Sequence, residues 1–188
     1  MWWLENRALF RRSARLAAVF LLAGLTAACF QPLYGTQTIG GGPALRDRLA
    51  SVDVLLIDAA SGTPEARIGV ELRNALIYDL TGGDSPSAPN YRLRVQLVGK
   101  RTSVIIDPTT ARPDVENYGI DATYTLIDVA TGKPVVQGTT FSRVSYDVPG
   151  QQQRFARARG LRDAENRAAK VISEQIRSRL ASYFVAGT

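Results

Sequence analysis

The sequence predicts an α+β domain, a two-layer sandwich in which two helices pack on one face of a four-stranded, mostly antiparallel sheet. The predicted order is β-α-β-β-β-α. Apolar residues recur with helical spacing over 65–80 and 152–184, and they alternate with polar residues over 91–98 and 118–129. A hydrophobic content of 45% in 188 residues is enough to form a substantial core. Helices and sheets of this kind bury their apolar faces against each other in layers.

The first strand and the first helix are predicted within residues 51–83. The segment 51–57 (SVDVLLI) is rich in β-branched and aliphatic residues, as is typical of a strand. Thr63 is the expected N-cap of the first helix, with Pro64 in its first turn. Gly82 and Gly83 follow the last apolar position and are expected to end this helix.

The other three strands and the last helix follow in order. The strand beginning at Tyr91 is expected to continue past Gly99 through a bulge or bend. The strand over 118–129 points Ile120, Ala122, Tyr124 and Leu126 inward, and the turn ATGK returns it as a hairpin with 134–146. In the last helix, Gly160 is expected to mark a kink or the helix start. Its apolar stripe is Leu161, Ala164, Ala168, Ile172, Ile176, Leu180 and Phe184.

The N-terminus has the layout of an export signal. Residues 7–15 carry four arginines, residues 16–25 are apolar, and small residues follow at 26–28. An apolar run of ten residues is too short to span a bilayer, which needs ~20. We therefore predict a lipoprotein-type signal peptide over residues 1–28.

Cys29, the sole cysteine, directly follows Ala27 and Ala28. This placement predicts a lipid-attachment site at which the thiol is acylated and cleavage leaves the cysteine as the new N-terminus. Two alternatives stay open, because Thr26 stands where leucine is usual: cleavage by ordinary signal peptidase, or a free buried cysteine. Phe30, rather than aspartate, follows the cysteine and favours delivery to the outer membrane. A lipid on Cys29 would supply a stable anchor.

The remaining chain is predicted to hold one tether and one domain. A Gly-Gly-Gly-Pro cluster at 40–43 indicates a flexible segment, so we assign 29–48 to a lipidated N-terminus and tether. Residues 49–188 are assigned to a single α+β domain.

Composition excludes most familiar chemistries. The chain has no histidine and one cysteine, which excludes imidazole catalysis, imidazole metal sites and an internal disulfide. Glycine-rich phosphate-binding motifs and a GxSxG motif are also missing. The acidic residues Asp53, Asp58, Asp107 and Asp114 follow no catalytic or calcium-binding spacing. We predict that the protein is not an enzyme and needs no cofactor or metal.

The net charge also argues against nucleic-acid binding. It is +6, but residues 1–28 hold four of the 23 basic and one of the 17 acidic residues, so about +3 belongs to the remainder. A nucleic-acid-binding domain usually shows a denser basic stripe.

Four segments resemble the LptE family of lipopolysaccharide-assembly lipoproteins in its alphaproteobacterial form. They are CFQPLYG at the cysteine, RIGVELRNAL in the first helix, YTLIDVATGKPVVQGTTFSRVSYDV in the hairpin and RLASYF in the last helix. The resemblance covers the chain from Cys29 onward in the right order. The family usually has a glycine after the cysteine, whereas this chain has Phe30.

The resemblance implies a non-enzymatic outer-membrane lipoprotein, anchored at the periplasmic face. Such proteins act as plugs inside a large β-barrel partner, LptD, which they help to assemble, and they help to deliver lipopolysaccharide to the outer leaflet. The residues alone also allow a generic periplasmic lipoprotein that binds a lipid or peptide. A carboxylate-dependent envelope hydrolase is a third reading.

Basic residues of the predicted sheet are candidate contacts for lipopolysaccharide phosphates, since guanidinium binds phosphate bidentately. The alternative for each is a solvated charge that protects the sheet from aggregation. The arginines near the start of the last helix either contact anionic lipid or form a solvated face. The sheet candidates are Arg92, Arg94, Lys100, Arg101, Lys133 and Arg143, and the helix arginines are Arg154, Arg157, Arg159, Arg162 and Arg167.

Overall fold

A computed structural model describes residues 44–84, 86, 88–107, 112–148 and 153–186, and every structural statement below concerns these residues. The predicted signal peptide, Cys29 and most of the predicted tether lie outside them. The α+β prediction is confirmed. The elements in chain order are α2 (Leu45–Ala50), β1 (Val52–Val54), α3 (Pro64–Thr81), β2 (Tyr91–Asp107), β3 (Arg112–Asp128), β4 (Pro134–Asp147) and α4 (Arg154–Ala186).

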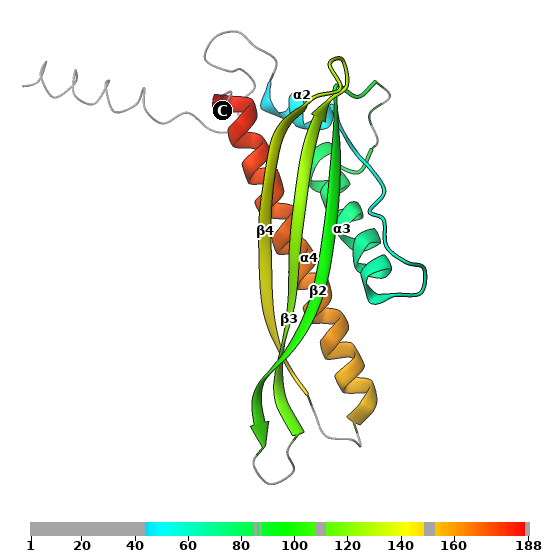
Figure 1. Cartoon of the computed structure of the whole chain (residues 1–188), viewed down its shortest axis with the longest axis vertical. Helices are drawn as coiled ribbons and strands as arrows, with labels where there is room; N and C mark the ends of the chain where they lie inside the picture. The colour runs from blue at the N-terminus through cyan, green and yellow to red at the C-terminus, as the bar shows by residue number, and fades with distance from the viewer. Residues whose placement is uncertain (1–43, 85, 87, 108–111, 149–152, 187–188) are drawn as a thin grey trace, which may run out of the picture. The chain divides into compact units, whose positions relative to one another are not determined.

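The four strands form one mixed sheet in the order β1-β2-β3-β4 (Figure 1). β1 is short and pairs with β2 in parallel, while β2, β3 and β4 form a long antiparallel meander. The predicted turn between β3 and β4 is present, with Gly132 at φ 68°. Because sequential strands are neighbours, the meander needs only local connections.

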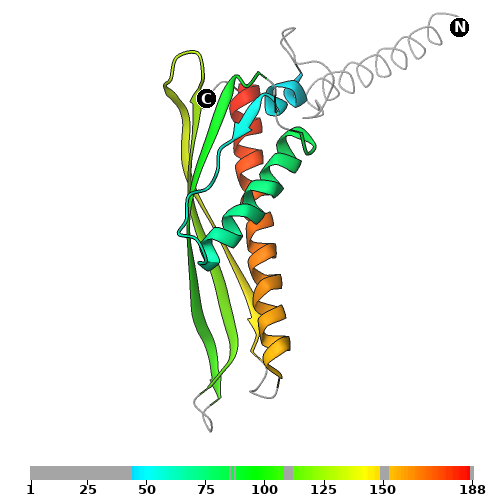
Figure 2. The same ribbon diagram turned by 90° about the vertical axis from the view of Figure 1, so that its right-hand side faces the viewer.

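The helices α3 and α4 lie on one face of the sheet, as predicted, and leave the other face without a helix (Figure 2). The apolar positions predicted for β3 are buried, and so are those of α4 except the half-buried Leu161. The core therefore lies between the sheet and the two helices.

Both ends of α3 follow the predicted chemistry. The Thr63 hydroxyl oxygen accepts a hydrogen bond from the backbone N–H of Ala66 at 3.2 Å. At the other end, Gly82 adopts a left-handed conformation with φ 83° and donates its N–H to the Tyr78 carbonyl. A side-chain cap and a left-handed glycine satisfy backbone groups that a helix end leaves unpaired.

The structure also contains a helix that the sequence does not predict. α2 buries Leu45 and Leu49, and the Arg48 guanidinium donates to the Phe184 carbonyl at 2.9 Å. Six residues hold too few turns to establish a helical period, so α2 was assigned in part to the tether. The folded part thus includes residues 45–48.

The prediction of a bulge at Gly99 is wrong. Gly99 pairs in register with Ile120, and the register of β2 with β3 shifts later, between Ser103 and Ile105 and again between Ile105 and Ile106. Glycine is required there because a side chain would collide with the Tyr118 hydroxyl, which lies over it.

Further boundaries differ from the prediction. β3 begins at Arg112, six residues before the predicted start at 118. β1 ends at Val54, three residues early, although the Leu55 N–H still donates to the Leu93 carbonyl. α4 begins at Arg154, so Gly160 lies inside the helix and does not start it.

Candidate functional site

The helix-free face of the sheet carries mostly polar side chains, as the alternation predicts. Arg92, Arg94 and Gln96 of β2 are exposed on it, beside Asp121 and Thr123 of β3. Their chain neighbours Leu93, Val95 and Ala122 are buried on the helix side. Period-two alternation therefore separates an apolar core face from a hydrated face.

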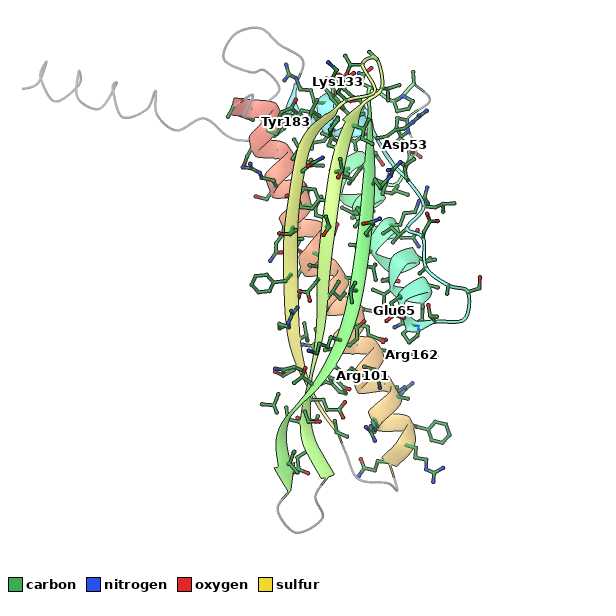
Figure 3. The ribbon with its side chains drawn as sticks, in the orientation of Figure 1. Asp53, Glu65, Arg101, Lys133, Arg162 and Tyr183 are labelled. Atoms are coloured by element: carbon green, nitrogen blue, oxygen red, sulfur yellow. The ribbon has the colours of Figure 1, made fainter. Side chains whose placement is uncertain are left out.

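Three of the six candidate cations lie near the turn between β3 and β4. Arg92 is in register with Ile127 of β3, and Ile127 is in register with Pro134, which follows Lys133 in the chain. Arg94 comes two residues later on the same face as Arg92. Figure 3 shows Lys133 at this end of the strands. Arg92, Arg94 and Lys133 are exposed, and none forms an ion pair within the described residues.

Hydrogen bonds to Asp128 hold the turn that presents Lys133. Asp128 accepts hydrogen bonds from the backbone N–H of Thr131 at 2.8 Å and from its hydroxyl at 3.1 Å. These hydrogen bonds, the backbone one first, hold the pKa of the Asp128 carboxyl below its usual value. The carboxylate therefore stabilises the turn as a charged acceptor.

Lys100 and Arg143 lie on either side of Gly119, farther along the same face. Gly119 is in register with both of them. The Arg143 side chain crosses Gly119 so closely that a Cβ there would lie 2.6 Å from its Cδ. A strand glycine therefore makes room for an arginine side chain.

Four contacts hold Arg143 in this position. Its guanidinium donates to the Asp121 carboxylate at 2.7 Å and to the carbonyls of Ile120 and Ser142 at 3.1 and 2.9 Å. It also lies 5.5 Å from the centre of the Phe141 ring. Arg143 is thus a neutralised cation, whereas the neighbouring Lys100 is exposed and forms no ion pair among the described residues.

Arg101 lies on the opposite face of the sheet. It is in register with Tyr118, whose side chain is buried on the helix side. Figure 3 shows Arg101 far along the strands from Lys133. The six candidates therefore form two groups on the helix-free face, Arg92–Arg94–Lys133 and Lys100–Arg143, with Arg101 apart from both.

Sequence reasoning missed a buried polar cluster on the helix side. Glu116 of β3 is 8% exposed and accepts hydrogen bonds from the Tyr146 hydroxyl and, at 3.3 Å, from Arg157 of α4. Burial first, and then the bond to Glu116, raise the pKa of Tyr146 to about 12. The cluster joins β3, β4 and α4, and no sequence spacing connects the three positions.

Some of the arginines at the start of α4 form ion pairs, and the others are exposed. Arg157 pairs with Glu116 and Arg167 pairs with Asp163, while Arg67 of α3 pairs with the buried Glu165. The side chains of Arg154, Arg159 and Arg162 are exposed. α4 therefore begins with cations at the end where a helix favours anions.

The described residues include open hollows at the surface and no metal-binding cluster. They contain no group of three or more carboxylate or thiol residues placed to hold a metal ion. One open hollow of about 510 Å³ lies between β4 and α4, and another of about 500 Å³ lies between the start of α3 and α4. Within the described part, no helix is both long enough and apolar enough to cross a bilayer.

Comparison with known proteins identifies both a family and a fold. The family model described as "LptE: Lipopolysaccharide-assembly" matches residues 45–180. No curated protein matches the chain in sequence.

Three solved structures that resemble this chain are described as lipoproteins. A putative lipoprotein from Caulobacter crescentus aligns with a TM-score of 0.59 and 22% identity, covering 77% of this chain and 97% of the other. A minor lipoprotein from Acinetobacter baumannii aligns with a TM-score of 0.53 and 15% identity, covering 72% of this chain and 94% of the other. The rare lipoprotein B from Shewanella oneidensis aligns with a TM-score of 0.50 and 14% identity, covering 72% of this chain and 96% of the other. At these identities the structures support the fold.

Proposed function

Because the chain belongs to the LptE lipopolysaccharide-assembly family, we propose that it is a non-enzymatic outer-membrane lipoprotein that partners a large LptD-like β-barrel. In this role it assists folding of the barrel and delivery of lipopolysaccharide to the outer leaflet. Membership of the family itself establishes a role in lipopolysaccharide assembly.

The hydrated face of the sheet is the observation that carries the barrel proposal. α3 and α4 cover one face only (Figure 2). The other face presents Arg, Thr, Gln and Asp side chains along the meander. The interior of a large outer-membrane barrel is polar. A mostly polar sheet face fits such a lumen, and its exposed apolar side chains include Val98 and Phe141, both in register with Asp121.

The proposed anchor is a lipid on Cys29, at the periplasmic face of the outer membrane. Cys29→Ser in the full chain removes the acylated sulfur, so we expect the protein to move from the membrane fraction to the soluble fraction. Cys29→Ser protein that stays in the membrane fraction without the barrel would contradict this anchor.

The proposed lipopolysaccharide contacts lie mainly in the Arg92–Arg94–Lys133 group. These cations are exposed and free of ion pairs among the described residues, so they can bind phosphate without first breaking an internal bond. Lys100 has the same freedom, and Arg101 is a separate candidate on the helix side. Arg143 is held by Asp121 and two carbonyls, so it is the weakest candidate.

Co-purification tests the barrel partnership. The full chain is expressed with its cognate barrel and isolated in detergent through a tag on this chain. We expect a stoichiometric complex that survives size-exclusion chromatography. Recovery of this chain only as a free monomer, with the barrel folded and present, would count against the partnership.

Lipopolysaccharide binding is tested separately with matched double variants. Arg92→Ala/Arg94→Ala removes two cations from the sheet face, while Arg46→Ala/Lys170→Ala removes two exposed cations from the helix layer. We expect weaker binding only for the first, by roughly tenfold if each phosphate contact contributes as an exposed charge pair does. Equal affinities of two folded variants would remove Arg92 and Arg94 from the site.

A further inference from the structure

β2 has an edge that only its first residues use. β1 pairs with Tyr91–Leu93, whereas β2 continues to Asp107. Within the described residues, no strand borders β2 beyond Leu93 on this side, and the bond from the Leu55 N–H to the Leu93 carbonyl is the last one that reaches it. We call residues Arg94–Ile106 the open β2 edge.

The ladder geometry tells which backbone groups face this edge. The Leu93 carbonyl points toward the β1 side, because it accepts from Leu55. In an antiparallel pair, both polar groups of one residue point to the same side, and the side alternates along the strand. Leu97, Gly99 and Arg101 therefore direct N–H and C=O groups to the open edge. Such a row is a template for an added strand.

β1 shows what kind of strand this edge accepts. It places Val52 and Val54 in the core and Asp53 in register with Arg92. The pairing thus combines backbone bonds, buried apolar side chains and a carboxylate beside a cation. Cross-strand neighbours of opposite charge stabilise a sheet.

The open β2 edge is positively charged and partly apolar. The side chains of Arg94, Lys100 and Arg101 form no ion pair or hydrogen bond within the described residues, and the sequence 94–106 contains no acidic residue. Val98, Val104 and Ile106 are 66%, 52% and 57% exposed. Like charges disfavour pairing with a second copy of this edge and favour an acidic strand.

A buried hydroxyl, that of Tyr118, lies beside the open β2 edge. Tyr118 is 3% exposed, and its hydroxyl has no hydrogen-bond partner. Its ring extends from β3 across β2, so that the hydroxyl lies over Gly99. This buried hydroxyl lies on the helix side of Gly99, near the Glu65 carboxylate of α3, so it faces away from the helix-free face on which Arg94 and Lys100 lie.

We propose that the open β2 edge binds an extended acidic segment of a partner protein as an added strand. The backbone of that segment pairs with Leu97, Gly99 and Arg101, and its carboxylates lie on the helix-free face beside Arg94 and Lys100. The mode is strand addition, in which backbone bonds supply affinity and side chains supply specificity. It does not depend on the proposed barrel partnership.

Amide exchange of the full chain, followed by NMR, tests this binding with two defined probes. One is an acetylated peptide that alternates valine and glutamate, and the other alternates valine and lysine. We expect the glutamate peptide to slow exchange at Leu97, Gly99 and Arg101, because bonded amides are protected. No protection, equal protection by both peptides, or protection confined to β4 would overturn the proposal.

Charge-reversal variants test the specificity. Arg94→Glu/Lys100→Glu reverses the two charges on the helix-free face of the edge and should bind the lysine peptide in preference, changing the ratio of the two affinities by at least roughly tenfold. Lys133→Glu/Lys170→Glu makes the same change in net charge at exposed positions away from the edge and should keep the original preference. A change of preference in both double variants would mean that net charge alone decides.

A proline variant tests the backbone contribution. Arg101→Pro removes the N–H that faces the edge, a place where strands tolerate proline, and Arg101→Ala removes the same charge but keeps the N–H. We expect Arg101→Pro to bind the glutamate peptide more weakly than Arg101→Ala does. Equal binding by the two folded variants would contradict strand addition.

Discussion

Single residues in this sheet act in pairs, and the pair formed by Gly119 and Arg143 shows how. Arg143 crosses Gly119 and reaches Asp121 and two backbone carbonyls. Tyr124 covers Gly138 in a similar way from the neighbouring strand. In each pair, the missing side chain of glycine is replaced by a long side chain of the partner strand.

This pairing predicts that Gly119→Ala changes the free energy of unfolding in opposite directions with and without the Arg143 side chain. Glycine in a strand costs ~0.5–1 kcal/mol relative to alanine, so Gly119→Ala should stabilise the sheet where there is room. In the natural chain the new Cβ displaces Arg143, so we expect a net loss of about 1 kcal/mol in the free energy of unfolding. In the Arg143→Ala background the same substitution should be neutral or stabilising. Urea unfolding of the four proteins measures the coupling, and additive effects would contradict it.

Tyr146 is expected to make the free energy of unfolding fall as pH rises above 10. Its pKa is raised to about 12 in the folded state, above the ordinary value of 10.0, mainly by burial and by Glu116. The neutral phenol is therefore favoured by folding. Its contribution is complete below pH 10 and is lost as pH rises through about 12.

We expect Tyr146→Phe to reduce the fall in the free energy of unfolding between pH 10 and 12, as measured by urea unfolding. Tyr78→Phe, at an exposed tyrosine, serves as the control and should leave the pH profile unchanged. Unaltered slopes in both variants would show that Tyr146 is not responsible.

Among the elements, α3 illustrates how the sequence encodes a helix with both ends defined. The Thr63 cap, Pro64 in the first turn and Gly82 at the end were predicted from residue types alone, and all three are confirmed. Each is a local interaction within a few residues, which is why the sequence suffices to predict it.

The cap gives a prediction at this scale. Thr63→Ala should lower the free energy of unfolding by ~1 kcal/mol, because the Ala66 N–H loses its acceptor. Thr63→Ser keeps the hydroxyl, so its free energy of unfolding should stay close to that of the natural protein. Thermal or urea unfolding measures both, and equal losses in the two variants would argue against the cap.

Elements that depend on distant partners were harder to predict. The strand order was left open, α2 was missed, and the bulge was assigned to Gly99 because glycine in a strand often marks one. Its real role depends on Tyr118, which is remote in sequence. The candidate cations were placed on the correct strands and the turn, but their grouping required the register.

For the whole molecule, the folded unit includes α2. Leu45 and Leu49 are 2% and 3% exposed, and Arg48 connects α2 to the end of α4. A protein that begins at Ala44 should therefore keep the stability of the full chain. One that begins at Val52 should lose roughly 3–6 kcal/mol, since burying each leucine contributes ~1.5–3 kcal/mol. Equal midpoints of unfolding for the two truncated proteins would show that α2 is dispensable.

The position of α4 in the chain has a consequence for synthesis. α4 is the last element, and it covers β3, β4 and α3 at once, as Figures 1 and 2 show. During synthesis the meander can form its hairpins before α4 has been made. Its apolar face stays exposed to solvent until α4 is complete and can cover it. A chain that stops within residues 154–186 would therefore have an uncovered apolar sheet face and would tend to aggregate. We expect quality-control proteases to remove it.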